Sequence, residues 1–353
     1  MYKEEMDIKL EAIKKQKSVK ILAIESSCDE TSVAIVENGR TVLSCVIATQ
    51  IEIHKRFGGV VPEVASRNHI LAIDNVCREA LQNAGLSFDD IDVIAVTYGA
   101  GLLGALLVGV NYAKGLAYAL NKPLLAINHI KGHIASNYIS HKNLEPPFVC
   151  LLVSGGHTAI LNVKDYTHFD MIGTTVDDAV GEAFDKVARI MGLSYPGGVS
   201  IDNFAKEGNN NINFAHKNVL AGTYNFSFSG IKTAVINYVH NKEQKGESIS
   251  IPDISASFQT YVVDELAGKT LKAVKEFGHK KLVVAGGVSA NSFLKKRLTE
   301  ECEASEIELF MPELKYCTDN AAMIGACAYF ELMNGLKSSD FSLTAKSTIP
   351  LMG

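Results

Sequence analysis

The sequence repeats one pattern of strands and helices, and this repeat limits the possible folds more than any other feature. The first copy predicts a β-meander of three short strands, followed by a helix, a strand, a second helix and a further strand. These elements are expected at residues 19–49, 62–84, 91–99, 101–120 and 123–128. At residue 148 the pattern restarts with FVCLLVSGGHTAILNVKDY, after which helices and the segment KKLVVAGG follow. Two such halves predict an α/β fold in which duplicated lobes enclose a central cleft.

Length, composition and charge are those of a globular protein with two domains. The 353 residues are too many for one small core, and 47% hydrophobic with 21% charged residues is ordinary for soluble proteins. The seven cysteines include no CxxC pair, which favours a reducing cytoplasm over a disulfide framework or thiolate zinc site. No apolar run has the length of a membrane span and no signal-peptide pattern opens the chain, so we expect a cytoplasmic protein without membrane contact. The net charge of −5 allows a polyanionic partner without indicating one.

The repeat also predicts domain boundaries. Residues 1–19 are charged and only marginally amphipathic, and we interpret them as an N-terminal extension, either an appended helix or a frayed tail. Lobe I is expected at residues 20–128 and lobe II at residues 129–324. The C-terminal helical stretch, about residues 325–353, is expected to join lobe I.

The segment INHIKGHIASN contains a histidine pair with helical spacing. His129 and His133 lie four residues apart, so both imidazoles fall on one face of a helix, as metal ligands would. The zinc-protease helix has the same spacing but needs a glutamate after the first histidine, where this chain has Ile130. Asp319 in CTDN is a candidate third ligand, although an aspartate at a helix start is also a common N-cap. A His–His–Asp set suits Fe(II) or Zn(II) and would hold and polarise an anionic substrate.

Two glycine turns indicate a nucleotide cleft. SGGHT and AGGVSAN each follow a buried strand, and paired glycines expose backbone N–H groups for phosphate contact. GAGLLG at residues 99–104 resembles a dinucleotide fingerprint, but the next acidic residue is Glu145, so that interpretation fails. In DDAVGEAFDK, we expect Asp178, Glu182 and Asp185 on one helical face, with one carboxylate directed at the cleft.

Eight segments together resemble the signatures of one family. They are IESSCDETS, HKRFGGVVPEVASRNH, HIKGH, LLVSGGHT, GEAFDKVARIMGLSYPGG, FSFSGIKT, AGGVSAN and CTDNAAMIG. In this order, and without a missing block from about Lys20 to the C-terminal region, they are similar to the tRNA adenosine threonylcarbamoyltransferases. An older label for this family is O-sialoglycoprotein endopeptidase.

The resemblance implies a fold of the sugar-kinase, actin and chaperone-ATPase type, with the nucleotide cleft between the lobes. It implies an acyltransferase that moves a threonylcarbamoyl group from threonylcarbamoyl-adenylate to N6 of the adenosine beside the anticodon, with release of AMP. The implied substrates are tRNAs that read codons beginning with A. In bacteria the implied partners are a paralogous subunit without the catalytic site and a small P-loop ATPase.

The resemblance also implies roles for individual residues. The metal ligands would be His129, His133 and Asp319, with Fe(II) as the favoured ion and Zn(II) as the alternative. The substrate-binding positions would be Leu152, Val153, Ser154, Gly155, Gly156, Asp185, Gly198, Asp202 and Asn291. Asp29 or Glu30, in the turn after the first strand, is our hypothesis for the carboxylate that accepts the proton from N6.

Other functions remain open at the level of sequence. A metalloprotease would agree with the older label but has no glutamate in HIKGH to activate water. A small-molecule kinase of the same superfamily would leave the histidine pair without a role. A catalytically inactive paralogue is expected to have lost the histidines and CTDN, and both are present.

Overall fold

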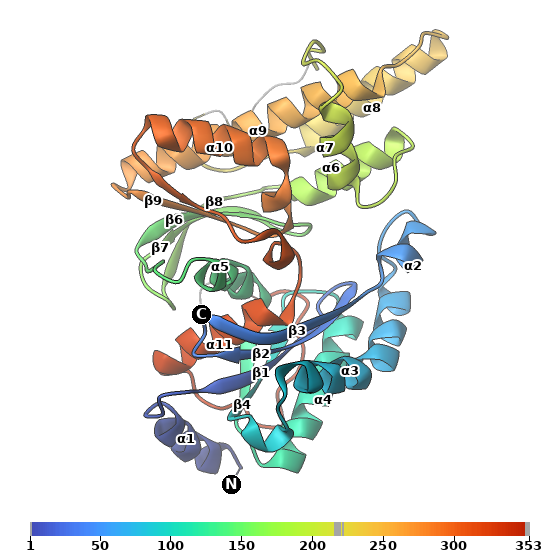
Figure 1. The fold of residues 1–353 in the computed structure, drawn as a ribbon. Coiled ribbons are helices and arrows are strands. Elements are labelled where there is room, and N and C mark those ends of the chain that lie inside the picture. The colour runs from blue at the N-terminus through green and yellow to red at the C-terminus, as the bar shows by residue number, and fades with distance from the viewer. Residues whose placement is uncertain (1, 215–219, 221, 350–353) are drawn as a thin grey trace.

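The protein is built from two five-stranded mixed sheets with helices around and between them (Figure 1). The computed structural model describes residues 2–214, 220 and 222–349. The strand order is β3–β2–β1–β4–β5 in lobe I and β10–β9–β6–β7–β8 in lobe II. The lobe I strands are β1 (Lys20–Glu25), β2 (Glu30–Glu37), β3 (Thr41–Thr49), β4 (Val93–Gly99) and β5 (Leu124–Asn128). The lobe II strands are β6 (Phe148–Val153), β7 (Thr158–Val163), β8 (Phe169–Thr174), β9 (Lys281–Ala285) and β10 (Glu308–Phe310).

The two sheets have the same topology. In each lobe an antiparallel meander of three strands is extended by two parallel strands, so β1 to β5 correspond to β6 to β10 in chain order. The first strand of each lobe is central, and its apolar residues are buried on both faces. This position explains the continuous apolar runs ILAI and FVCLLV. The predicted α/β duplication is therefore confirmed.

Helices α3 (Pro62–Ala84) and α4 (Leu103–Leu120) pack on the lobe I sheet after the short α2 (Ile51–Lys55). Pro62 begins α3, and Gly85 ends it in the left-handed conformation with φ of 65°. By length and composition α4 could cross a membrane, so the expectation that no apolar run reaches that length is wrong. One face of α4, including Leu106 and Val110, is fully buried and packs against the sheet and α3, as in a core helix.

Lobe II has more helices between its meander and its parallel strands than lobe I has. These are α6 (Val180–Ile190), α7 (Gly197–Ala205), α8 (Ser229–Gln244) and α9 (Ile251–Glu276), and α10 (Ser292–Ala304) follows β9. Short 3₁₀ turns lie at η1 (Phe88–Asp90), η2 (Gly287–Ala290) and η3 (Leu314–Tyr316). Helices α7 and α9 contact each other, and α6 packs on α7 (Figure 1).

Helices α5 (His129–Ser140) and α11 (Ala321–Met333) pack against each other between the two sheets (Figure 1). They are equivalent elements, because each follows the last parallel strand of its lobe. Close approach depends on small residues: a Cβ on Gly132 would lie 2.7 Å from Ile324, and a Cβ on Gly325 would lie 2.7 Å from Val36. Both helices share one hydrophobic core with strands of both sheets.

The first and last described segments of the chain, α1 (Tyr2–Ile13) and the residues after α11 up to 349, both pack on lobe I. The N-terminal extension contains α1, a helix that buries Met6, Leu10 and Ile13, so the helical alternative is the correct one. Helix α11 contacts strands of the lobe I sheet, and the segment after it continues along β5 and β4, where Ser339 N–H bonds Leu124 and Lys346 N–H bonds Tyr98. Residue 1 of the extension and residues 350–353 of the predicted C-terminal stretch lie outside the described residues.

Candidate active site

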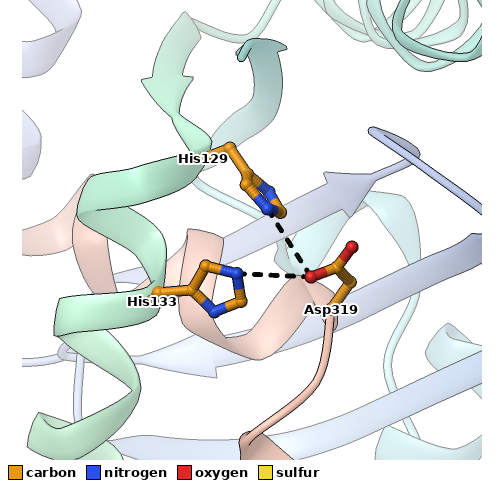
Figure 2. Close-up of side chains that lie close together, drawn as sticks. All are labelled: His129, His133 and Asp319. Atoms are coloured by element: carbon orange, nitrogen blue, oxygen red, sulfur yellow. Dashed lines mark ion pairs between the residues drawn. The ribbon is translucent and has the colours of Figure 1, made fainter. Parts of the chain in front are cut away.

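The N-terminal ends of α5 and α11 bring the three predicted metal ligands together (Figure 2). Asn128 caps α5, and its side chain accepts a hydrogen bond from the N–H of Ile130 at 2.8 Å. His129 is therefore the first residue of α5, and His133 lies one turn further along the same face. The interpretation of Asp319 as an N-cap is wrong: Asn320 caps α11, and Asp319 lies one residue before it.

The two imidazoles and the carboxylate converge on one point. Oδ1 of Asp319 lies 3.5 Å from Nε2 of His129 and 3.3 Å from Nε2 of His133. All three candidate ligand atoms lie within 4.8 Å of one another. His133 is 1% exposed, and neither of its ring nitrogens has a hydrogen-bond partner with suitable geometry among the described residues. A buried polar atom without a partner is costly, and a metal ion would remove that cost.

The charges of the triad also fit a divalent cation. Burial raises the pKa of Asp319, but the nearby His129 and His133 outweigh it and hold that pKa at about 2. Burial lowers the pKa of His129, but the carboxylates of Glu25 and Asp319 outweigh it and raise the pKa to about 9. The carboxylate is thus ionised at neutral pH, and a cation bound at Nε2 of His129 would displace a proton from that imidazole. Two nitrogen donors and one oxygen donor suit Fe(II) or Zn(II).

A cavity of about 470 Å³ opens beside Asp319, between the lobes. Lobe I contributes the turn between β1 and β2, and lobe II contributes the glycine turn after β6, the α6–α7 region and the start of α10. The predicted residues that line this cavity are Asp29, Glu30, Ser154, Gly155, Asp185, Gly198, Asp202, Asn291 and Asp319. A single cavity thus contacts the glycine turns, the acidic turn and one metal-type ligand.

The other predicted residues lie elsewhere. Leu152 and Val153 are buried in β6 at 1% and 0% exposure, and Gly156 is exposed at the far side of the turn. His129 and His133 are not part of the cavity wall and reach it only through Asp319. Tyr195 and Leu314 line the cavity, although sequence reasoning did not select them. Tyr195 is the first residue of YPGG and Leu314 lies three residues before CTDN, so these two motifs were the signal that could have found them.

The cavity walls are fixed by internal hydrogen bonds. Oδ1 of Asp185 accepts from the N–H of Gly197 at 2.7 Å, which fixes the YPGG turn. Oδ1 of Asp202 accepts from the hydroxyl of Ser292 at 2.9 Å, which ties α7 to the start of α10. Nδ2 of Asn291 donates to Gln259 at 2.7 Å, while its Oδ1 caps α10. These residues therefore form a preorganised wall of the cavity.

The expectation of three carboxylates on one helical face is wrong. Helix α6 begins at Val180, so Asp178 lies before it and pairs instead with Lys186 and Lys232. Glu182 forms an exposed ion pair with Lys186, at 2.7 Å. Of the three, only Asp185 lines the cavity.

The acidic turn of lobe I has unusual electrostatics. Burial, together with the charges of Asp29 and Asp319, raises the pKa of Glu30 to about 8, against the opposing hydrogen bond from Thr49. Burial also raises the pKa of Asp29. Oε2 of Glu30 is buried without a hydrogen-bond partner among the described residues. Carboxyl groups with raised pKa in a cavity are typical of sites that transfer protons.

The fold and the site define a class: two-lobed proteins with the fold of actin, sugar kinases and related ATPases. Full-length HypF in a phosphate- and nucleotide-bound form has this fold, with a TM-score of 0.60 and 17% identity over 89% of this chain and 46% of that chain. Component A of (R)-2-hydroxyglutaryl-CoA dehydratase from Acidaminococcus fermentans aligns with a TM-score of 0.52 and 16% identity, over 89% of this chain and 99% of that chain.

Sequence comparison is more specific. The sequence profile of the tRNA N6-adenosine threonylcarbamoyltransferase family matches residues 41–326. The proteins of that name from Clostridium perfringens and Clostridium botulinum are each 58% identical to this chain. The alignments cover 94% and 92% of this chain, and 98% and 96% of those proteins. The chain belongs to the tRNA N6-adenosine threonylcarbamoyltransferase family.

Proposed function

We propose that this protein transfers a threonylcarbamoyl group from threonylcarbamoyl-adenylate to N6 of the adenosine adjacent to the anticodon, in tRNAs that read ANN codons, and releases AMP. The observation that carries the proposal is the placement of a His–His–Asp triad at the edge of a cavity lined by a glycine turn. An adenylate needs both features, because it joins a nucleotide to a phosphate-activated acyl group. Membership of the family supports the same reaction.

His129, His133 and Asp319 would hold one divalent ion, for which we favour Fe(II) over Zn(II). When bound, such an ion supplies positive charge that grips an anionic substrate and polarises its carbonyl. The nucleotide part of the substrate would lie along residues 152–156, Asp185, Gly198, Asp202 and Asn291. Those that line the cavity, and the backbone of the glycine turn, support this assignment.

The residues of this chain would then orient the reactants and move one proton. N6 of adenosine attacks the carbamoyl carbon, the bond from that carbon to the phosphate oxygen breaks, and AMP leaves with the electron pair. Backbone N–H groups of the turn at Ser154 and Gly155 would stabilise the negative charge that develops on oxygen. Asp29 or Glu30 would accept the proton from N6, a role for which a raised pKa is an advantage.

The test combines purified protein, preformed threonylcarbamoyl-adenylate and unmodified tRNA, followed by mass analysis of the digested nucleosides. A mass gain on adenosine that is absent with His133→Ala and retained with His168→Ala is expected. His168 is an exposed histidine paired with Asp165 in the β7–β8 turn, and it belongs neither to the triad nor to the cavity wall. Unchanged transfer by His133→Ala would refute the role of the triad, and unchanged turnover with both Asp29→Ala and Glu30→Ala would refute the assigned base.

We further propose that the protein acts in the cytoplasm with a paralogous, non-catalytic subunit and a small P-loop ATPase. If the protein alone gives no mass gain on adenosine, these two proteins are added to the assay. Recovery of the mass gain would mean that the active form is a complex. Continued silence with both partners present would refute the transferase function.

A further inference from the structure

A fully buried carboxylate lies behind the candidate metal centre. Glu25 ends β1 and is 0% exposed. Among the described residues its only ion-pair partner is His129, since no lysine or arginine reaches it. A buried carboxylate has to be paired or hydrogen-bonded, because an uncompensated buried charge costs several kcal/mol. The proposed chemistry of the cavity gives Glu25 no direct role, because Glu25 does not line the cavity.

Both oxygens of Glu25 act as acceptors with defined donors. Oε1 accepts from the N–H of Ser27 at 2.6 Å, and Oε2 accepts from the hydroxyl of Thr97 at 2.5 Å. Oε2 also lies 3.1 Å from Nδ1 of His129. The carboxylate is thus held by β4 and by the turn after β1, and its remaining acceptor position faces the imidazole. An amide that kept its oxygen toward the N–H of Ser27 would turn its NH₂ group toward Nδ1 of His129, which would then have to accept and not donate.

This contact determines which nitrogen of His129 faces the other ligands. In the neutral imidazole, when Nδ1 carries the proton and donates a hydrogen bond to Glu25, Nε2 has its lone pair free. Nε2 is the atom that lies 3.5 Å from Oδ1 of Asp319 (Figure 2). His133 has no such support, since its Nδ1 has no hydrogen-bond partner among the described residues.

We propose that Glu25 is a positioning residue for the metal centre: it fixes His129 in the tautomer whose Nε2 binds a divalent cation, and its negative charge partly offsets that of the cation. The inference rests on the metal-binding part of the proposed function. A carboxylate that accepts from the second nitrogen of a histidine ligand raises the basicity of the ligand and fixes its ring orientation. Glu25, the last residue of the core strand β1, would be this carboxylate for His129.

The experiment measures Zn(II) affinity of the full-length chain by competition with a chromophoric chelator. Glu25→Gln is expected to weaken Zn(II) binding by about 10- to 100-fold. Thr97→Val, which frees one side of the carboxylate, is expected to weaken binding by a smaller factor and serves if Glu25→Gln does not fold. Glu37→Gln is the matched control for affinity, since Glu37 ends the neighbouring strand β2, lies opposite Lys20 at the other end of β1 and accepts a hydrogen bond from Ser18. Its Zn(II) affinity should be that of the parent.

A second variant decides which acceptor matters. Oγ of Ser27 also lies 3.1 Å from Nδ1 of His129. Ser27→Ala should change Zn(II) affinity by less than about 3-fold if Glu25 is the acceptor. A larger loss with Ser27→Ala than with Glu25→Gln would overturn the proposal.

A spectroscopic measurement separates positioning from a general structural role. In long-range ¹H–¹⁵N spectra of the Zn(II)-loaded protein, His129 should show a protonated Nδ1 and a metal-bound Nε2, and Glu25→Gln should shift the Nδ1 proton. Coordination through Nδ1, or equal Zn(II) affinity of parent and Glu25→Gln, would overturn the inference and leave the transferase function intact. Failure of the parent itself to bind Zn(II) or Fe(II) would instead refute the metal centre in the proposed function.

Discussion

The two lobes share one topology but contribute different chemistry at equivalent positions. After the first strand, lobe I carries carboxyl groups at Asp29, in the turn, and at Glu30, the first residue of β2, whereas the lobe II turn is Ser154 followed by two glycines. Both turns face the same cavity. One lobe therefore supplies groups that can take a proton, and the other supplies backbone donors. A duplicated fold can thus diverge in chemistry without any change in strand order.

The same asymmetry appears where α5 and α11 begin. Both helices are capped by asparagine, Asn128 in α5 and Asn320 in α11. The residue after the cap is His129 in α5, and the residue before the cap is Asp319 in α11. Each helix supplies only part of the triad, so the candidate metal centre exists only where the two equivalent helices meet (Figure 2).

The largest expected effect comes from removing the contribution of α11. Asp319→Asn keeps the shape of the side chain but removes the anionic ligand, so we expect transfer activity to fall by at least about 100-fold and Zn(II) affinity to fall with it. The nucleoside mass assay and chelator competition provide the two measurements. Asp340→Asn, at an exposed aspartate that bonds Ser342, is the charge-matched control. Activity within 3-fold of the parent would show that α5 alone forms the site.

A second prediction tests whether the lobes are packed alike at the cleft. Gly101 follows β4 with φ of 154°, and an added Cβ would lie 2.6 Å from the carbonyl oxygen of Ser27. Gly286 follows β9 with φ of 93°, and its Cβ would lie 2.4 Å from the carbonyl oxygen of Val153. In each lobe a positive-φ glycine thus lets the chain after the fourth strand pass the end of the first. Gly101→Ala and Gly286→Ala should each lower the free energy of unfolding by about 2–4 kcal/mol.

Urea unfolding checks this prediction against one control in each lobe. Gly115 and Gly156 have ordinary φ and no atom within 4 Å of an added Cβ. Gly115→Ala lies in a helix and should raise stability by up to about 1 kcal/mol, and Gly156→Ala should be nearly neutral. A loss confined to one of the two positive-φ variants would show that the equivalence of the lobes does not extend to this contact.

Much of this comparison could be predicted from sequence, because it depends on local patterns. The meander, the glycine turns and the limits of α3 at Pro62 and Gly85 follow from residues close together in the chain. The choice between Asp319 and Asn320 as the cap of α11 could not be made, since both residue types cap helices well. The start of α6 after Asp178 was missed because Asp178 is engaged by Lys232, a residue 54 positions away.

Contacts between distant segments account for the remaining differences. In the sequence, Glu25 is only the polar residue at the end of an apolar strand. Its contact with His129, 104 positions away, is what indicates a positioning role. Tyr195, just before α7, and Leu314, in η3, line the same cavity as the lobe I turn, and no local pattern encodes this proximity. The packing of α5 on α11 likewise depends on Gly132 meeting Ile324 across the molecule.

A third prediction compares how Glu30 and the lobe II glycine turn affect the pH dependence of the free energy of unfolding. The pKa of Glu30 is about 8 in the folded protein and near 4.5 for a free glutamate, so between these values the folded state holds a proton that the unfolded state has lost. The stability that Glu30 contributes is therefore complete below about pH 4.5 and is lost as the pH rises through 8. Relative to Glu30→Gln, the parent should lose about 1–3 kcal/mol between pH 5 and pH 9.

Urea midpoints of the two proteins at pH 5, 7 and 9, with a chelator present, provide this measurement. Asp29 also has a raised pKa, through burial, so Asp29→Asn should reduce the pH dependence in the same direction. The Ser154–Gly155–Gly156 turn has no carboxyl group, so Ser154→Ala should leave the pH dependence unchanged. Parallel curves for the parent and Glu30→Gln would contradict the raised pKa of Glu30.

The smallest expected effect concerns the contact between equivalent turns on the side of the lobes away from the cavity. Arg40, in the β2–β3 turn, donates to the carbonyl oxygens of His141 and Leu144 after α5, at 3.2 and 2.8 Å. It also donates to the hydroxyl of Tyr166, at 3.2 Å, in the β7–β8 turn of lobe II, and its guanidinium lies 5.0 Å from the ring centre of Phe330. The two turns are equivalent in the duplication, so this arginine joins the lobes through matching elements.

Arg40→Ala should therefore lower the free energy of unfolding by about 1–2 kcal/mol, because it leaves carbonyl groups without their donor and removes a cation–π contact. Arg40→Lys should recover less than half of that loss, since an ammonium cannot bond several acceptors in one plane. The control is Arg189→Ala, which removes a single exposed hydrogen bond from α6 to Gly58 of lobe I, at 2.6 Å, and should cost less than about 0.5 kcal/mol. Equal losses for Arg40→Ala and Arg189→Ala in urea unfolding would mean that the lobes are held together by the shared α5–α11 core and not by their equivalent turns.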